Sequence, residues 1–114
     1  LSVLLKKIVE DKKIIFSNPD VGLNTFINAK TVAKIINYLI LSKFNNLILN
    51  LCSKGTLKLK KIVDRIYFKL KKRRNYIFGK NTKHFNISTI KLKKYKVPIV
   101  SMTQTVKLFL DDNL

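Results

Sequence analysis

The feature that most constrains the fold is a change of hydrophobic period in NNLILNLCSKGTLKLKKIVDRI, residues 45–66. Residues 47–52 are almost all apolar, residues 53–56 break the run, and apolar side chains then recur at helical spacing. This order predicts a strand, a tight polar turn and a helix. Such a junction either presents helix N–H groups to an anion or only connects the two elements. We favour the simple β-to-α turn.

The same spacing rules predict the other elements of the chain. Helices are expected at residues 2–11, 31–43, 56–72 and 88–95 and from residue 101 or 103 onward. Strands are expected at residues 13–16, 25–29 and 47–52, with a turn-rich loop at 17–22, a short strand or extended loop at 73–86 and an extended segment at 97–100.

Two of the expected helices have well-defined apolar faces. Thr31 is the expected N-cap of the second helix, whose buried face would comprise Val32, Ile35, Ile36, Leu39 and Ile40. The 56–72 helix would bury Leu59, Ile62, Val63, Ile66 and Leu70. Strands alternating with helices predict an α/β fold: one small domain, residues 1–114, with short strands, about four to five helices and no dinucleotide-binding sheet.

Charge is the most unusual property of the composition. The 24 Lys and Arg outnumber the 6 Asp and Glu, which gives a formal net charge of +18. Such a chain attracts nucleic acid, acidic lipid or phosphorylated metabolites, although an AT-rich genome would also enrich lysine on any solvated surface. The segment Lys54–Arg74 interleaves Tyr67 and Phe68 with basic residues. It is either a platform for single-stranded nucleic acid or a solvated helix face.

The residues do not form a recognisable catalytic set. His84 is the only histidine, the paired acids are sequence neighbours, and the three glycines form no dinucleotide-binding loop. Tyr67 and Lys71 have the spacing of a catalytic Tyr-Lys pair, but a chain so rich in lysine produces that spacing by chance. Cys52 lies in an apolar run and is expected to be buried. We therefore predict no catalytic, cofactor-binding or metal-binding residue within the chain.

Location is constrained by two further features. The longest apolar region, residues 35–52, is interrupted by lysine and asparagine, which makes it a poor membrane span. A single cysteine excludes an internal disulfide and fits a cytoplasmic protein. The chain begins at Leu1 and its only methionine is Met102, so we expect it to be a fragment, a processed product or a domain of a longer protein.

The order of the motifs resembles the C-terminal region of NAD-dependent epimerase/dehydratases, the extended short-chain dehydrogenase/reductases. That family has "F-I-x-V-x-D-V-A" before a helix, "I-x-N-V-G-S-G" at a strand and turn, and "S-L-x-E-L-V" on the next helix. The residues here that match these three patterns are Phe26, Ile27, Ala29, Val32, Ala33, Leu49, Asn50, Leu51, Ser53, Gly55, Leu57 or Leu59, Ile62 and Val63. The tail, residues 86–113, is similar to the closing pattern "D-x-S-K-L-K-x-L-G-W-x-P" and "S-L-E-E-G-L", through Ser88, Leu92, Pro98, Ser101, Thr105 and Val106.

The resemblance implies a substrate-binding lobe for a nucleotide-sugar, from an enzyme of surface-polysaccharide precursor synthesis. NAD or NADP would bind a separate N-terminal domain upstream of Leu1, so this fragment alone would bind no cofactor and be inactive. The family often has an arginine that contacts the nucleotide phosphates two residues before Phe26, where this chain has Asn24. The expected substrate-binding residues are Asn24, Phe26, Arg73 and Arg74, within the substrate-facing segments 17–26 and 73–83.

A second hypothesis comes from a different class of protein. The charge and the Lys54–Arg74 segment are also typical of a small basic nucleic-acid-binding protein, such as a ribosomal component of an AT-rich genome. The two hypotheses differ in their ligand, which is a nucleotide diphosphate in the first and a polynucleotide in the second.

Overall fold

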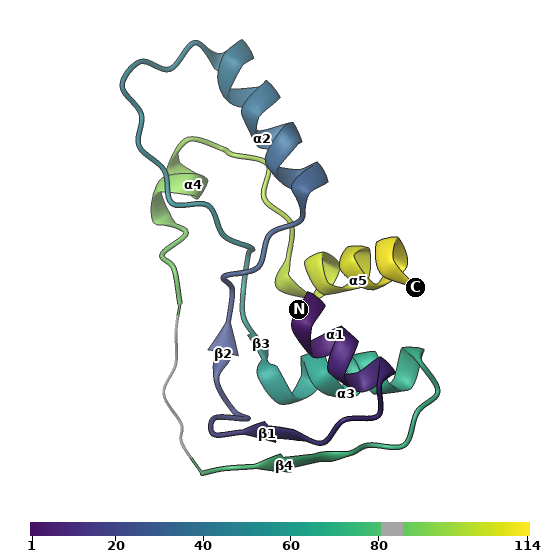
Figure 1. The fold of residues 1–114 in the computed structure, drawn as a ribbon. Helices are drawn as coiled ribbons and strands as arrows, with labels where there is room; N and C mark the ends of the chain where they lie inside the picture. The colour runs from purple at the N-terminus through teal and green to yellow at the C-terminus, as the bar shows by residue number, and fades with distance from the viewer. Residues whose placement is uncertain (81–85) are drawn as a thin grey trace. The chain divides into compact units, whose positions relative to one another are not determined.

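The computed structural model describes residues 1–80 and 86–114 (Figure 1). In these residues the chain forms five helices and four short strands. They are, in order, α1 (Ser2–Val9), β1 (Ile14–Phe16), β2 (Gly22–Leu23), α2 (Ala29–Ser42), β3 (Leu57–Lys58), α3 (Leu59–Lys69), β4 (Tyr76–Phe78), α4 (Ile90–Lys94) and α5 (Met102–Asn113). The predicted α/β class is confirmed, and the described residues contain only two-stranded sheets.

The chain divides into two compact units. Unit 1 comprises the described parts of Leu1–Gly22 and Leu57–His84, and unit 2 those of Leu23–Thr56 and Phe85–Leu114. Two compact units can belong to one domain, so the single domain over residues 1–114 stays a prediction.

Unit 1 is built on a parallel pair of strands and a helix pair. β1 and β4 pair in the register Ile14↔Tyr76, Ile15↔Ile77 and Phe16↔Phe78, and α1 lies beside α3 (Figure 1). The apolar face of α3 is buried as the 3.6-residue period predicts, with Ile62, Val63 and Ile66 fully inside. α3 begins at Leu59, later than expected, because Leu57 and Lys58 form β3.

Unit 2 has its core beneath α2. Ile35, Cys52, Leu92 and Val97 are buried together, with half-buried apolar side chains around them. The face of α2 was predicted only in part: Ile35 is buried, but Ile36 and Ile40 are 52% and 69% exposed. The N-cap was also predicted wrongly: Asn28 caps the helix by accepting a hydrogen bond from the N–H of Lys30, and Thr31 is a buried helical residue.

Two predicted strands are not formed. Residues 25–29 contain no strand, and β2 lies just before them at Gly22–Leu23. Residues 47–52 alternate between half-buried and exposed up to Cys52, as a strand would, but they form no ladder with another described strand. The nearest pairing is an isolated parallel bridge between Lys54 and Ser101. A period-2 pattern shows only that alternate side chains are buried. A strand also needs a neighbouring strand whose backbone groups pair with its own.

The remaining elements agree with their predictions. α4 lies within residues 88–95, and β4 lies within residues 73–86. α5 begins after Ser101, whose hydroxyl accepts a hydrogen bond from the N–H of Gln104 at 3.1 Å. Val106 and Leu110 are buried on this helix. His84 and Lys83 lie outside the described residues.

Candidate functional site

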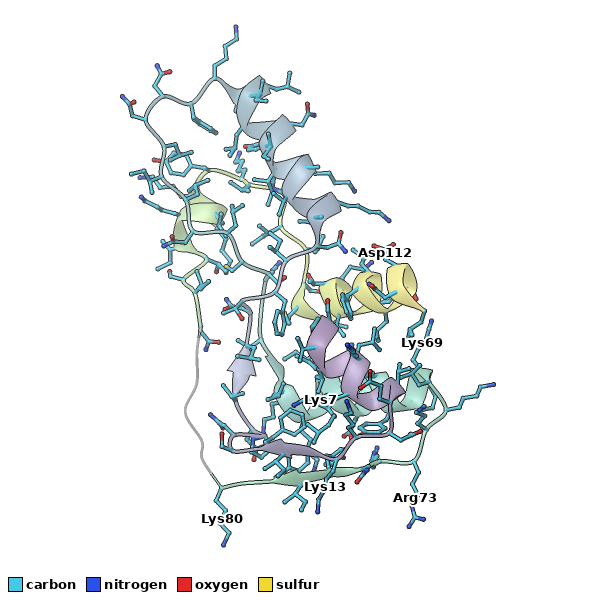
Figure 2. The ribbon with its side chains drawn as sticks, viewed as in Figure 1. Lys7, Lys13, Lys69, Arg73, Lys80 and Asp112 are labelled. Carbon is cyan, nitrogen blue, oxygen red and sulfur yellow. The ribbon has the colours of Figure 1, made fainter. Side chains whose placement is uncertain are left out.

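Arg73 and Arg74 lie on the turn between α3 and β4, which is anchored on both sides. Before the arginines, Lys72 donates from Nζ to the Val9 carbonyl at 2.6 Å and to the Asp11 carboxylate at 2.9 Å. After them, Asn75 donates from Nδ2 to the Asp11 carbonyl at 3.2 Å. The backbone of this turn is therefore held in place while both arginines remain exposed. In Figure 2, Arg73 extends away from the ribbon at one end of β4, and Lys80 does so at the other.

Arg74 belongs to a small polar network inside unit 1. Its Nε lies 3.0 Å from Oδ1 of Asp64, and the Tyr76 hydroxyl donates to the same carboxylate oxygen at 2.6 Å. Burial is the largest cause, and together with the hydrogen bond to Asp64 it raises the pKa of Tyr76 to about 12. The ion pair uses Nε, so the terminal N–H groups of the Arg74 guanidinium remain available for a ligand.

An open hollow of about 440 Å³ beside this turn is lined by Asp11, Arg73, Arg74 and Asn75. The Asp11 carboxylate is already paired with Lys72, which reduces its repulsion toward an anion. Two guanidinium groups beside an anchored backbone offer planar, charge-assisted donors of the kind that bind phosphate. The hollow is thus a candidate anion site.

Asn24 and Phe26 lie in unit 2 and have structural partners there. Asn24 is 3% exposed. Its Nδ2 donates to the Ile87 carbonyl at 2.7 Å, and its Oδ1 accepts from the Ile87 N–H at 2.8 Å. Phe26 is half-buried, and its carbonyl accepts a hydrogen bond from the Ser53 hydroxyl. The substrate-binding roles of Asn24 and Phe26 stay predictions. To offer both its Nδ2 and its Oδ1 to a ligand, Asn24 would have to break its two hydrogen bonds to Ile87.

The turn that follows residues 47–52 is a simple connection. Gly55 has φ +69° in the turn, and β3 separates it from α3. Two N–H groups at the start of α3 are taken by backbone carbonyls: Leu59 donates to Val21 at 3.0 Å, and Lys60 donates to Pro19 at 2.9 Å. A helix N-terminus with its donors satisfied in this way has little left for an anion. These contacts favour the simple connection over an anion-binding turn.

The other side chains considered for chemistry also have structural roles. Tyr67 is buried, and its hydroxyl donates to the Asn75 carbonyl at 3.2 Å. Cys52 is buried as predicted, and burial raises the pKa of its thiol. In the described parts of the chain, no three His, Cys, Asp or Glu side chains gather as metal ligands. Among the same residues, no helix is both long and apolar enough to cross a membrane.

Sequence reasoning missed two pairings that shape the candidate anion site. The Lys72–Asp11 pair joins residues 61 positions apart, and the Tyr76–Asp64 bond joins residues 12 apart. Asp64 sits at a helical position flanked by basic residues, so its partner could have been any of several. Neither pairing has a local sequence signal, because both depend on how α1, α3 and β4 pack.

Comparison with solved structures finds a similar fold in dTDP-glucose 4,6-dehydratase from Bacillus anthracis, which was solved in complex with NAD. The TM-score is 0.71 at 12% sequence identity, and the match covers 96% of this chain. It covers 36% of the dehydratase, so this chain spans about a third of that protein's length. No family model matches the sequence, and no curated protein matches it. The likeness shows a shared fold over nearly the whole chain.

The described residues do not fit the dinucleotide that the dehydratase holds. A dinucleotide site needs a Gly-rich turn between a strand and the N-terminus of a helix. α2 is capped by Asn28, and at the start of α3 the N–H groups of Leu59 and Lys60 are already bonded to backbone carbonyls. A Cβ at Gly79 would lie 2.8 Å from the Ser17 carbonyl oxygen, so this glycine serves close backbone packing. Nothing in these residues forms a cradle for a pyrophosphate at a helix end.

Proposed function

We propose that this chain is the substrate-binding lobe of an NAD(P)-dependent nucleotide-sugar epimerase, dehydratase or reductase, acting in the cytoplasm on polysaccharide precursors. The observation that carries the proposal is the fold shared with dTDP-glucose 4,6-dehydratase over 96% of the chain. The collinear motifs of residues 25–66 and 86–113 support the same assignment. A separate N-terminal domain would supply the dinucleotide site, because the described residues do not fit one.

In this proposal, Arg73 and Arg74 contact the diphosphate of the substrate. Both are exposed on the anchored turn, and both line the candidate anion site. The contact of Arg74 with Asp64 through Nε fixes the direction of its guanidinium and leaves the outer edge free. A diphosphate needs several charge-assisted donors at once, and two adjacent guanidiniums provide them without reorganising the backbone.

Asn24 has a supporting role in the proposal. The sequence pattern assigns it a place beside the phosphates, yet its amide joins the backbone of Ile87 on both sides. Unless that pair opens, Asn24 stabilises the segment that carries Phe26 and contributes no charge. The electrostatic part of recognition therefore rests on the two arginines.

The test is isothermal titration of the 114-residue chain with dTDP, at low salt. Replacing Arg73 and Arg74 with alanine should weaken binding by roughly 1.5–3 kcal/mol for a lost charge-assisted contact. The matched control is Lys6→Ala with Lys7→Ala, which removes the same charge from an exposed part of α1 in the same unit.

Three results would contradict the proposal. One is equal weakening in the arginine and the lysine double variants, which would indicate diffuse charge. Another is unchanged affinity in the arginine variant. The third is the absence of dTDP binding by the unmodified chain, which would show that this lobe does not supply the diphosphate contacts.

A further inference from the structure

One face of α3 carries two exposed cations followed by an exposed aromatic ring. Lys61, Arg65 and Phe68 follow one another at intervals of four and three residues, so they share one side of the helix. That side is opposite the buried residues Ile62, Val63, Ile66 and Tyr67. We refer to Lys61, Arg65 and Phe68 as the α3 stripe.

Phe68 is the most exposed large hydrophobic side chain of the described residues, at 87%. Single exposed apolar residues are common on protein surfaces and need no special account. What distinguishes this ring is its position on a helix whose apolar face is already complete on the other side. Phe68 adds nothing to the core, and its exposed ring follows two exposed cations on the same side of the helix.

The cations of the stripe have no competing partner. Asp64 is the only acid of α3, and its carboxylate is occupied by Arg74 and by the Tyr76 hydroxyl. Within residues 1–80 and 86–114, Lys61 and Arg65 form no ion pair or side-chain hydrogen bond. Both are exposed. Their charges are therefore free to meet an external anion.

The geometry suits a flexible polyanion with accessible ring systems. At a rise of about 1.5 Å per residue, Lys61 lies about 6 Å from Arg65 along the axis, and Phe68 lies about 4.5 Å further. We propose that the α3 stripe binds single-stranded nucleic acid, with Lys61 and Arg65 on successive phosphates and an unstacked base on the Phe68 ring. This surface is separate from the proposed substrate contacts and is supported by different observations.

Two other polyanions fit the stripe less well. Bases of a duplex are stacked on one another, so the ring of Phe68 would find no open base face there. A membrane-bound helix inserts its own apolar face into lipid, and the apolar face of α3 is buried in unit 1. A single aromatic ring gives little apolar area for a bilayer and enough for one base.

The test measures fluorescence anisotropy of labelled oligothymidine with the full chain at several salt concentrations. Phe68→Leu keeps an apolar side chain and removes the ring, and it should weaken single-strand binding about five- to hundredfold. Phe68→Trp should restore binding. Replacing Lys61 and Arg65 with glutamine should lower the slope of log affinity against log salt by about 0.7 for each lost phosphate contact.

The control variant replaces Lys34 and Lys93 with glutamine, because both are exposed lysines of unit 2. It removes the same charge and should change the slope less than the stripe variant. The proposal is refuted by equal losses in the two double variants, or by single-strand affinity that Phe68→Leu does not change. The proposal is also refuted if the chain binds vesicles of anionic lipid more strongly than oligothymidine and this binding depends on Phe68. That result would indicate a membrane surface as the ligand. Circular dichroism of each variant verifies that α3 is retained.

Discussion

Asn24 provides the most direct test of how this fold is held together. Its side chain is 3% exposed, and it satisfies both backbone groups of Ile87, which lies 63 residues away in the sequence. Its own carbonyl accepts a hydrogen bond from the Ser53 N–H at 2.9 Å. One residue thus connects three segments of unit 2 that are remote along the chain.

Replacing Asn24 with alanine removes the side-chain half of this connection. The Ile87 N–H and carbonyl then lose their partners in a partly buried place. Each hydrogen bond contributes roughly 0.5–1.5 kcal/mol net, so the free energy of unfolding should fall by about 2 kcal/mol. That is a large share of the roughly 5–15 kcal/mol that holds a domain folded. With a urea m-value of roughly 1–3 kcal/mol/M, the midpoint should drop by about 1 M.

The assay is urea unfolding of the 114-residue chain, followed by circular dichroism. Asn37→Ala is the matched control, because Asn37 is exposed on α2 and alanine favours a helix there. Asn24→Asp separates the two bonds, since a carboxylate can accept from the Ile87 N–H but cannot donate to its carbonyl. A protonated carboxyl can donate, so this variant should lose more stability at pH 7 than at pH 4, each compared with the unmodified chain. A cost for Asn24→Ala no larger than that of Asn37→Ala would refute the structural role.

Three further outcomes are expected. The chain alone should not bind NAD measurably, because it has no dinucleotide loop, and a specific micromolar site in titration calorimetry would overturn the lobe assignment. Since the pKa of Tyr76 is raised to about 12 in the folded chain, folding favours the neutral phenol, and the free energy of unfolding should fall as pH rises from about 10 toward 12. Asp64→Asn should reduce this dependence and lower the Tyr76 midpoint in an absorbance titration, and an unmoved midpoint would contradict the hydrogen bond. The pKa of Asp112 is lowered, chiefly by the hydrogen bond from Lys30, so Lys30→Met should raise that pKa in an NMR titration, and stability from this pair should be lost as pH falls through the folded-state value.

Periodicity predicted the elements that are held by their own apolar face. α3 buries Ile62, Val63 and Ile66 as its spacing predicts, and α5 begins after Ser101, at the expected place. Periodicity failed where a second element decides the outcome. Ile36 and Ile40 fit a helical stripe on α2 equally well, but the core of unit 2 lies on the side of Ile35. The sequence contains both stripes and does not say which one meets Leu92 and Val97.

The candidate site was predictable only in part, for a related reason. Arg73 and Arg74 come directly after an amphipathic helix, and from that position alone the sequence predicts that they are exposed. The anchoring of their turn depends on Asp11, which comes from the far end of the chain. Long-range polar partners have no period and no local motif, so the geometry that makes two arginines into a candidate site becomes visible only in the folded chain.

Asn24 shows how a family pattern can locate a position and leave its role open. The family pattern predicts a place beside the nucleotide phosphates for this residue, where family members often have an arginine. In the fold, the position is buried and faces the backbone of Ile87, so a short amide that both donates and accepts fits it, and a long cation would displace one hydrogen bond or both. Under the proposed function, the positive charge for a diphosphate would then come from another segment. Arg73 and Arg74 provide such charge on an anchored turn, which is why the proposed diphosphate contacts rest on them.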